Sequence, residues 1–212
     1  MATRFARARR RPTARTSGPQ GGPRLAAATR AVRQCRAYLA VLALLLAPGL
    51  ALAQFHESFE GPEPSWRWAD HDCSLRVVDH ARTFNQAQSG QASEFLHFQA
   101  GSGTFIHLVH TIPPARVIGE LQISVYIKSN QSGLQLAARV VLPRTKDPRT
   151  GKPHSLLIRG ASYAQAGTWQ KLTIDQPALL ASRQVPMLRS QLPYDIDERE
   201  AYVDLVVLNV FG

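Results

Sequence analysis

The feature that most constrains the fold is an alternation of side chains with a period of two in the middle of the chain. Apolar side chains recur at every second position over residues 117–128, and again over residues 134–142. A period of two places one face of an extended strand in a core and the other in solvent. The residues between the runs, 129–133, are rich in turn formers, and Pro143 follows the second run as an expected strand end. The two runs therefore predict an antiparallel β-hairpin.

Shorter extended segments occur along the rest of the domain, separated by clusters of glycine, serine, asparagine and proline. They cover residues 55–59, 75–80, 94–99, 104–110, 156–163, 169–174 and 201–210. Many short strands with closely spaced turns predict an all-β fold, an antiparallel β-sandwich. One or two short helices are expected near 177–192, because Pro186 should break or bend a single long one.

The last strand candidate, residues 202–211, is apolar on both faces, which is typical of a central strand with two neighbours. The sequence stops one residue later, at Gly212. We therefore expect a domain over 54–212 that lacks its final strand, as in a truncated chain or an excerpt of a longer protein.

The basic character of the chain is confined to its first segment. Residues 1–53 hold ten arginines, no lysine and no acidic residue, whereas residues 54–212 hold 15 basic and 15 acidic residues. Counted separately, the domain is formally neutral. Its charge therefore predicts no nucleic-acid partner.

The order of residues in that first segment is the order of a secretory signal. A basic low-complexity region, 1–36, precedes an apolar core in 37–53, which ends in the small-x-small sequence Ala51-Leu52-Ala53. We expect a disordered or helical signal segment, cleaved between Ala53 and Gln54, and a secreted or periplasmic product. If uncleaved, this segment is the expected contact with a membrane. Its apolar run reaches the ~20 residues of a spanning helix only by including a Pro-Gly break.

Cysteine usage leaves the domain without an internal disulfide. Cys35 would leave with the signal, and Cys73 is then alone. The domain must therefore be held together by a hydrophobic core.

Three short motifs, taken in order, resemble those of galactose-binding-like jelly-roll modules. They are Glu57-Ser58-Phe59-Glu60-Gly61, Ser89-Gly90, and Gly167-Thr168-Trp169-Gln170-Lys171-Leu172. Over 55–212 the chain is similar to the carbohydrate-binding modules of secreted bacterial glycosidases, and to N-terminal modules of exported planctomycete-type proteins. The resemblance implies a jelly roll, a non-catalytic carbohydrate-binding function and a structural calcium ion near Glu57 or Glu60.

Candidate sugar-binding residues follow from the chemistry of sugar recognition, which uses flat aromatic faces beside planar hydrogen-bonding groups. The polar face of the predicted hairpin offers such a set. Trp66 and Trp68 share one face if their segment is a strand. The alternatives are an ordinary solvent-facing sheet for the first set and a core or domain-interface role for the tryptophans. The hairpin set is Gln122, Tyr126, Gln135 and Arg139.

Enzyme chemistry is not expected, because none of the common catalytic or phosphate-binding motifs occurs. The acidic run 195–200 is predicted to be a solvated loop. We expect a secreted carbohydrate-binding module, an accessory domain of a larger extracellular protein, with a glycan and a downstream domain as partners. One alternative is a structural sandwich module that packs on a downstream domain. Another is the N-terminal part of a glycoside hydrolase whose catalytic part lies beyond Gly212.

Overall fold

A computed structural model describes residues 55–211, which contain nine strands and one helix. The signal segment and the predicted cleavage site at Ala53 and Gln54 lie outside the described residues. In chain order the elements are β1 (Arg67–His71), β2 (Leu75–Thr83), β3 (Ser93–Ala100), β4 (Ile106–Arg116), β5 (Ile123–Ile127), β6 (Gln135–Lys146), β7 (Pro153–Ser162), β8 (Gln170–Ile174), α2 (Pro177–Gln191) and β9 (Tyr202–Asn209).

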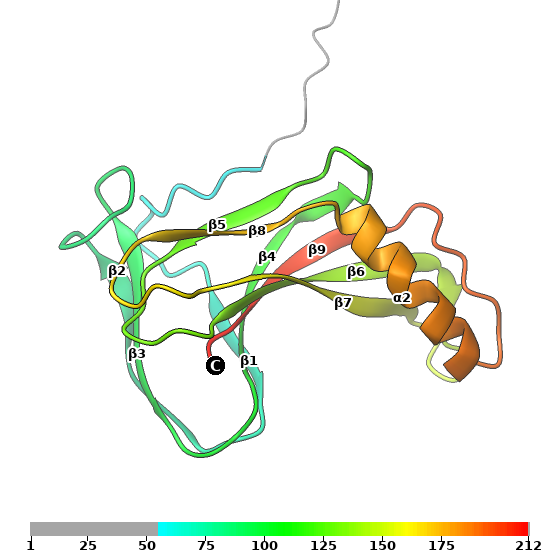
Figure 1. The fold of residues 1–212 in the computed structure, drawn as a ribbon, viewed down its shortest axis with the longest axis horizontal. Helices are drawn as coiled ribbons and strands as arrows, with labels where there is room; N and C mark the ends of the chain where they lie inside the picture. Colours follow the sequence, from blue (N-terminus) through cyan, green and yellow to red (C-terminus); the bar gives the residue numbers. More distant parts are fainter. Residues whose placement is uncertain (1–54, 212) are drawn as a thin grey trace, which may run out of the picture. The chain divides into compact units, whose positions relative to one another are not determined.

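All strand pairs are antiparallel, and most strands belong to one sheet. That sheet has five strands in the order β1-β4-β9-β6-β7, while β2 pairs with β3 and β5 pairs with β8 (Figure 1). The prediction of an all-β fold with antiparallel sheets is confirmed. Residues 55–59 are not a strand, contrary to expectation, and β1 was not predicted.

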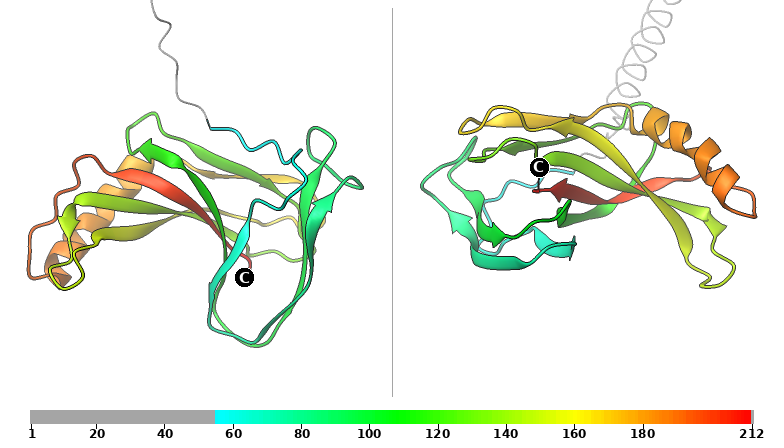
Figure 2. Two further views of the ribbon diagram at one scale, coloured as in Figure 1. Left: turned by 180° about the vertical axis from the view of Figure 1, so that it is seen from behind. Right: turned by 60° about the horizontal axis from the view of Figure 1, so that its bottom comes forward.

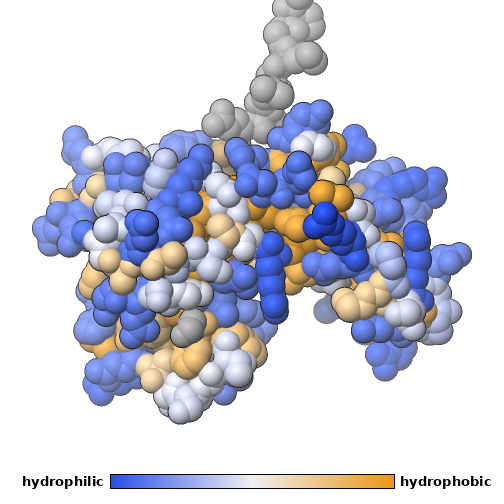
Figure 3. All heavy atoms as spheres, viewed as in Figure 1, coloured by the Kyte–Doolittle hydropathy of each residue, from blue (hydrophilic) through white to orange (hydrophobic). Residues whose placement is uncertain are grey.

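The hydrophobic core lies between two layers. One face of the five-stranded sheet packs against the inward side chains of β5 and β8, and α2 continues the second layer after β8 (Figure 1). Each buried Leu, Ile or Val side chain stabilises the fold by about 1.5–3 kcal/mol. Seen from the side, hydrophilic residues dominate the surface and hydrophobic residues show in the middle of the molecule (Figure 3). The core residues include Ile106, Leu108, Leu136, Ile158 and Val203 from the sheet, and Ile123, Leu172, Ile174 and Val185 from the second layer.

The helix expected near 177–192 is present as a single element. α2 begins with Pro177 in its first turn, where the missing backbone N–H costs nothing, and it continues through Pro186. Its buried residues are Pro177, Ala181 and Val185, at the four-residue spacing of one helix face. Within residues 55–211, no helix has both the length and the hydrophobicity needed to cross a bilayer.

The predicted hairpin between the two alternating runs is wrong. β5 pairs with β8, through Ile123 and Ile174 among others, while β6 pairs with β7 and β9. The segment between β5 and β6 therefore joins the two layers instead of forming a turn within one sheet. Buried Tyr163 fixes this crossing, because its hydroxyl donates to the carbonyl oxygen of Thr168 (2.7 Å) and accepts from the backbone N–H of Ser129 (3.1 Å). Pro143 does not end the second run either, since β6 continues to Lys146 across an irregular stretch of pairing.

β9 occupies the centre of the five-stranded sheet. Leu208 faces Leu108 of β4 on one side and Leu136 of β6 on the other. The prediction of a central strand is confirmed. Both of its neighbours, β4 and β6, come earlier in the chain.

Candidate functional site

The five-stranded sheet has a second face, which points away from the core and which we call the outer face. Side chains alternate along each strand, so Ala137 and Arg139 of β6 lie on the outer face while Leu136 and Ala138 lie in the core. Among residues 55–211, no helix or strand forms a layer over the outer face, as the right-hand view of Figure 2 shows. It is therefore a regular surface that is open to a ligand.

Strand register arranges the outer face in rows. One row takes a residue from every strand of the sheet: Arg67, Val109, Val207, Ala137 and Arg159. The next row contains Thr111, Leu205, Arg139 and Leu157. Because neighbouring strands lie about 4.8 Å apart, the five-strand row spans roughly 19 Å from one sheet edge to the other.

The middle of the outer face is apolar. Ala137, Val141 and Val207 are buried, although they do not belong to the core cluster on the other face. Half-buried Val109, Leu157 and Leu205 adjoin them. We call these six residues the apolar strip.

A bidentate ion pair between Arg139 and Asp204 lies across the apolar strip. Arg139 donates from Nε to Oδ1 of Asp204 (2.9 Å) and from Nη2 to Oδ2 (2.8 Å). These hydrogen bonds to Asp204 raise the pKa of Arg139 above its ordinary value, so the guanidinium stays charged. Asp204 lies where the pairing of β6 and β9 shifts by one residue, and such bulges redirect side chains.

Further polar groups surround the strip. Arg67, Arg116 and Arg159 are exposed, and Tyr202 is half-buried beside Arg139. His107 stacks on Phe105 with ring centroids 4.8 Å apart. Burial lowers the pKa of His107 from 6.5, Asp70 opposes that shift and Arg159 adds to it. Burial thus favours the neutral imidazole of His107.

The structure divides the predicted hairpin site between two surfaces. Gln135 and Arg139 lie on the outer face, whereas Gln122 and Tyr126 belong to β5 and point away from the core on the opposite layer. Gln122 donates to Asp175 Oδ1 at 2.7 Å, and Tyr126 is 45% exposed. The grouping was wrong because alternation identifies the polar face of a strand but not the sheet to which that strand belongs.

The two tryptophans share a face, as predicted, and that face is directed to the core. Trp66 is a buried member of the core cluster, and Trp68 packs against it. The ring of Trp68 meets Phe98 edge-on, with centroids 5.3 Å apart, and it meets His80 in the same way at 6.1 Å. These contacts match the core alternative and leave neither indole as a sugar platform.

Sequence reasoning missed a buried carboxylate, Glu94, whose side chain is only 4% exposed. It accepts hydrogen bonds from the backbone of Ser65 and Trp66 at 2.9 and 3.0 Å. It also pairs with Arg82 at 2.8 Å and with His80 at 2.6 Å. The available signal was its position on β3, two residues before Leu96, which packs on the core.

The proposed calcium ligands have other partners. Glu57 Oε1 accepts from the backbone N–H of Phe59 at 2.9 Å, and Glu60 Oε1 accepts from Gln91 at 2.9 Å, just after the Ser89-Gly90 turn. Calcium takes six to eight oxygen ligands. Within residues 55–211, no group of three or more His, Cys, Asp or Glu side chains is placed to hold a metal. The structural calcium ion therefore stays a prediction.

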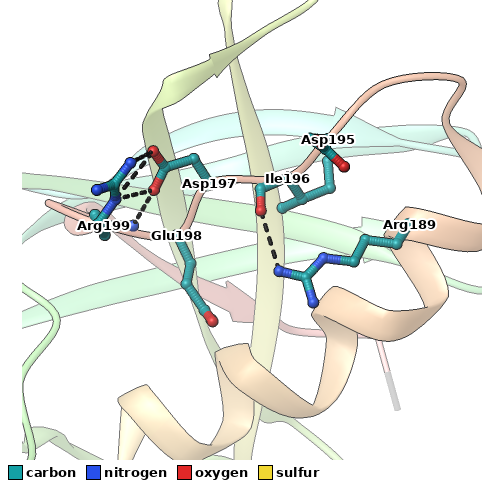
Figure 4. A pocket seen from close by; sticks show the side chains of 6 residues that line it. All are labelled: Arg189, Asp195, Ile196, Asp197, Glu198 and Arg199. Atoms are coloured by element: carbon teal, nitrogen blue, oxygen red, sulfur yellow. Dashed lines mark hydrogen bonds and ion pairs between the residues drawn. The ribbon is translucent and has the colours of Figure 1, made fainter.

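The acidic run 195–200 forms a loop beside an open hollow of about 530 Å³ (Figure 4). Its central carboxylate, Asp197, accepts from Arg199 at 2.6 Å and pairs with Arg144 at 3.2 Å. The Arg199 hydrogen bonds hold the pKa of Asp197 far below 3.8. The Thr145 hydroxyl donates to the backbone carbonyl oxygen of Asp197 (3.1 Å) and accepts from the Asp197 N–H (2.8 Å), which ties the loop to β6. Asp197 thus belongs to an exposed network of ion pairs and hydrogen bonds that holds the loop in place.

Together, the fold and the outer face define a two-layer antiparallel β protein whose main sheet offers an open surface with an apolar centre and arginines around it. No protein-family model matches the chain, and comparison with curated proteins and with solved structures gives no match either.

Proposed function

We propose that the protein is a non-catalytic carbohydrate-binding module of an exported protein, a jelly-roll-type sandwich that binds glycan on the outer face of its five-stranded sheet. The observation that carries the proposal is the Arg139–Asp204 pair crossing the apolar strip. Sugar rings present C–H faces and hydroxyl groups together. A site for them needs apolar contact beside oriented hydrogen-bonding groups.

The ion pair holds the hydrogen-bonding groups of Arg139 and Asp204 in fixed orientations. Arg139 uses Nε and Nη2 for Asp204, and within the described residues its Nη1 makes no hydrogen bond. Donors on Nη1 and lone pairs on the Asp204 carboxylate are thus available to sugar hydroxyls. Glycan binding would require little rearrangement of either side chain, because the hydrogen bonds between Arg139 and Asp204 already hold both in place.

The biological role would be adhesion. A module that holds a larger extracellular protein near a polysaccharide raises the effective concentration of its other domains without any chemistry. The signal-like order of residues 1–53 supports export, to the cell exterior or the periplasm. The balance of 15 basic and 15 acidic residues in 54–212 supports a partner other than nucleic acid.

The test is a glycan array probed with the exported product of the full chain, followed by variants. Arg139→Ala should abolish binding to any glycan that the array identifies. The matched control is Tyr126→Ala, which removes an exposed aromatic side chain from the opposite layer and should bind as the parent does. A lack of binding to all plant, algal and bacterial glycans on the array would contradict the proposal. Loss of binding in Tyr126→Ala alone would move the site to β5.

A structural module that packs on another domain of the same protein is the second candidate. The observation in its favour is the apolar strip, since half-buried Val109, Leu157 and Leu205 would gain from being covered. The structural role would be favoured over glycan binding if a longer form of the protein bound no glycan and protected Arg67 and Arg159 from chemical modification.

A further inference from the structure

We infer that the outer face binds a polyanionic glycan, one that carries carboxylate or sulfate groups, rather than a neutral one. This inference rests on the proposed function and specifies the ligand class of the same surface. It comes from the charges around the apolar strip and from where the strands place them.

The outer face has more basic than acidic groups. Arg67, Arg116, Arg139 and Arg159 lie on it, against Asp204 and the nearby Asp70. Asp204 is already committed to Arg139. Within residues 55–211 the other three arginines make no ion pair, so they are available to a ligand.

Two of these arginines stand at the ends of a single row. Arg67 is on edge strand β1 and Arg159 is on edge strand β7, with Val109, Val207 and Ala137 between them. A ligand lying along this row would meet half-buried Val109 over an otherwise buried apolar middle, and a guanidinium group at each end. That distribution fits an extended chain with repeated negative groups and an apolar face on its rings.

Guanidinium chemistry favours the anionic class. The planar fork of arginine forms paired, charge-assisted hydrogen bonds with carboxylate and with sulfate-like oxyanions, and these bonds are about twice as strong as neutral ones. Hydroxyl groups of a neutral glycan offer no such match. The arginines around the apolar strip should therefore discriminate between acidic and neutral polymers.

Two other polyanions are less well matched. Nucleic acid would need a continuous basic groove with stacking aromatics, whereas here the arginines stand apart around aliphatic side chains. An anionic bilayer is normally met by clusters of about four to eight basic residues. Among residues 55–211, the outer face carries three unpaired arginines.

The experiment is affinity electrophoresis of the exported product in gels containing polygalacturonate, dextran sulfate or uncharged dextran. Retardation is expected with one or both acidic polymers and not with dextran, and the two acidic gels separate carboxylate from sulfate recognition. Arg67→Gln with Arg159→Gln should weaken that retardation at least tenfold. The matched control, Arg76→Gln with Arg183→Gln, removes the same charge from exposed positions on β2 and α2 and should stay within twofold of the parent.

The outcomes separate this inference from the proposed function. Equal retardation by dextran would overturn the anionic preference and leave carbohydrate binding standing. Retardation by no polymer, together with a silent glycan array, would overturn both. An equal loss in the control pair would show a general charge effect and overturn the assignment to the outer face. Tighter binding to duplex DNA or to phosphatidylserine vesicles than to either acidic polymer would overturn the inference that the ligand is a polyanionic glycan.

Discussion

Gly160 of β7 lies directly against the backbone of Thr173 in β8: a Cβ atom at Gly160 would stand 2.5 Å from the Thr173 carbonyl oxygen. It would also stand 2.6 Å from Cγ1 of Ile174. The edges of the two layers approach so closely here because no side chain separates them. The contact closes one side of the core.

Gly160→Ala should therefore destabilise the protein by about 1–3 kcal/mol, the usual cost of overpacking, because a backbone oxygen has little room to move. Chemical denaturation followed by tryptophan fluorescence measures this change. Gly61→Ala is the control, since a Cβ there would meet nothing within 4 Å. Equal stability of the two variants would mean that the layers are not in contact at this point.

Glu94→Gln should cost roughly 3–5 kcal/mol, as expected when one partner of a buried ion pair loses its charge. Arg82, whose side chain is only 5% exposed, would be left without its nearest carboxylate. A double-mutant cycle with Arg82→Met measures the coupling, and we expect the double variant to be more stable than the sum of the single losses predicts. Simple additivity would refute a direct interaction. Arg144→Met, which breaks a half-exposed pair, should have a much smaller effect.

Asp72 should make the stability depend on pH in the acid range. The side-chain hydroxyl of Thr104, and then the backbone N–H groups of Phe105 and Thr104, lower the pKa of Asp72 from 3.8 to about 2. A carboxyl with a lowered folded-state pKa stabilises the fold above its unfolded value and loses that effect as pH falls through the folded value. The difference in Tm between the parent and Asp72→Asn should thus shrink between pH 3.8 and pH 2. A difference that stays constant over this window would contradict the assignment.

Tyr163→Phe should destabilise the protein by about 1–3 kcal/mol, because it removes the hydroxyl partner of the Thr168 carbonyl and the Ser129 N–H. The ring would still fill its place in the core, so the loss reports on the hydrogen bonds alone. Hydrogen exchange provides a second measurement, in which Ser129 should lose protection while Leu136 keeps it. Unchanged exchange at Ser129 would show that the hydroxyl does not hold the crossing between the layers.

Periodicity predicted which side chains face the core more reliably than it predicted which strands are neighbours. Ile123 and Ile127 point inward, as expected, and so do Leu136 and Val140. The pairing of their strands failed because the two runs lie in different layers. Any two alternating runs with a short turn between them produce the same hairpin signal.

The candidate site was predictable to a similar extent. Arg139 was identified as an exposed polar residue, but its partner Asp204 lies 65 positions later, and no local pattern links them. Glu94 escaped notice because a charged residue in an alternating strand is ordinarily assigned to solvent. Its burial depends on Ser65 and Arg82, which only the folded chain brings together.

The position of β9 has a consequence for the order in which the protein acquires its structure. β4 and β6 must both remain unpaired along their facing edges until residues 202–209 have been made and inserted between them. Such a sheet closes from the outside inward, by long-range contacts that form slowly, and its open edges invite pairing with other chains meanwhile. The pairs β1-β4 and β6-β7 can form earlier, but the sheet should be completed only after β9 has left the ribosome.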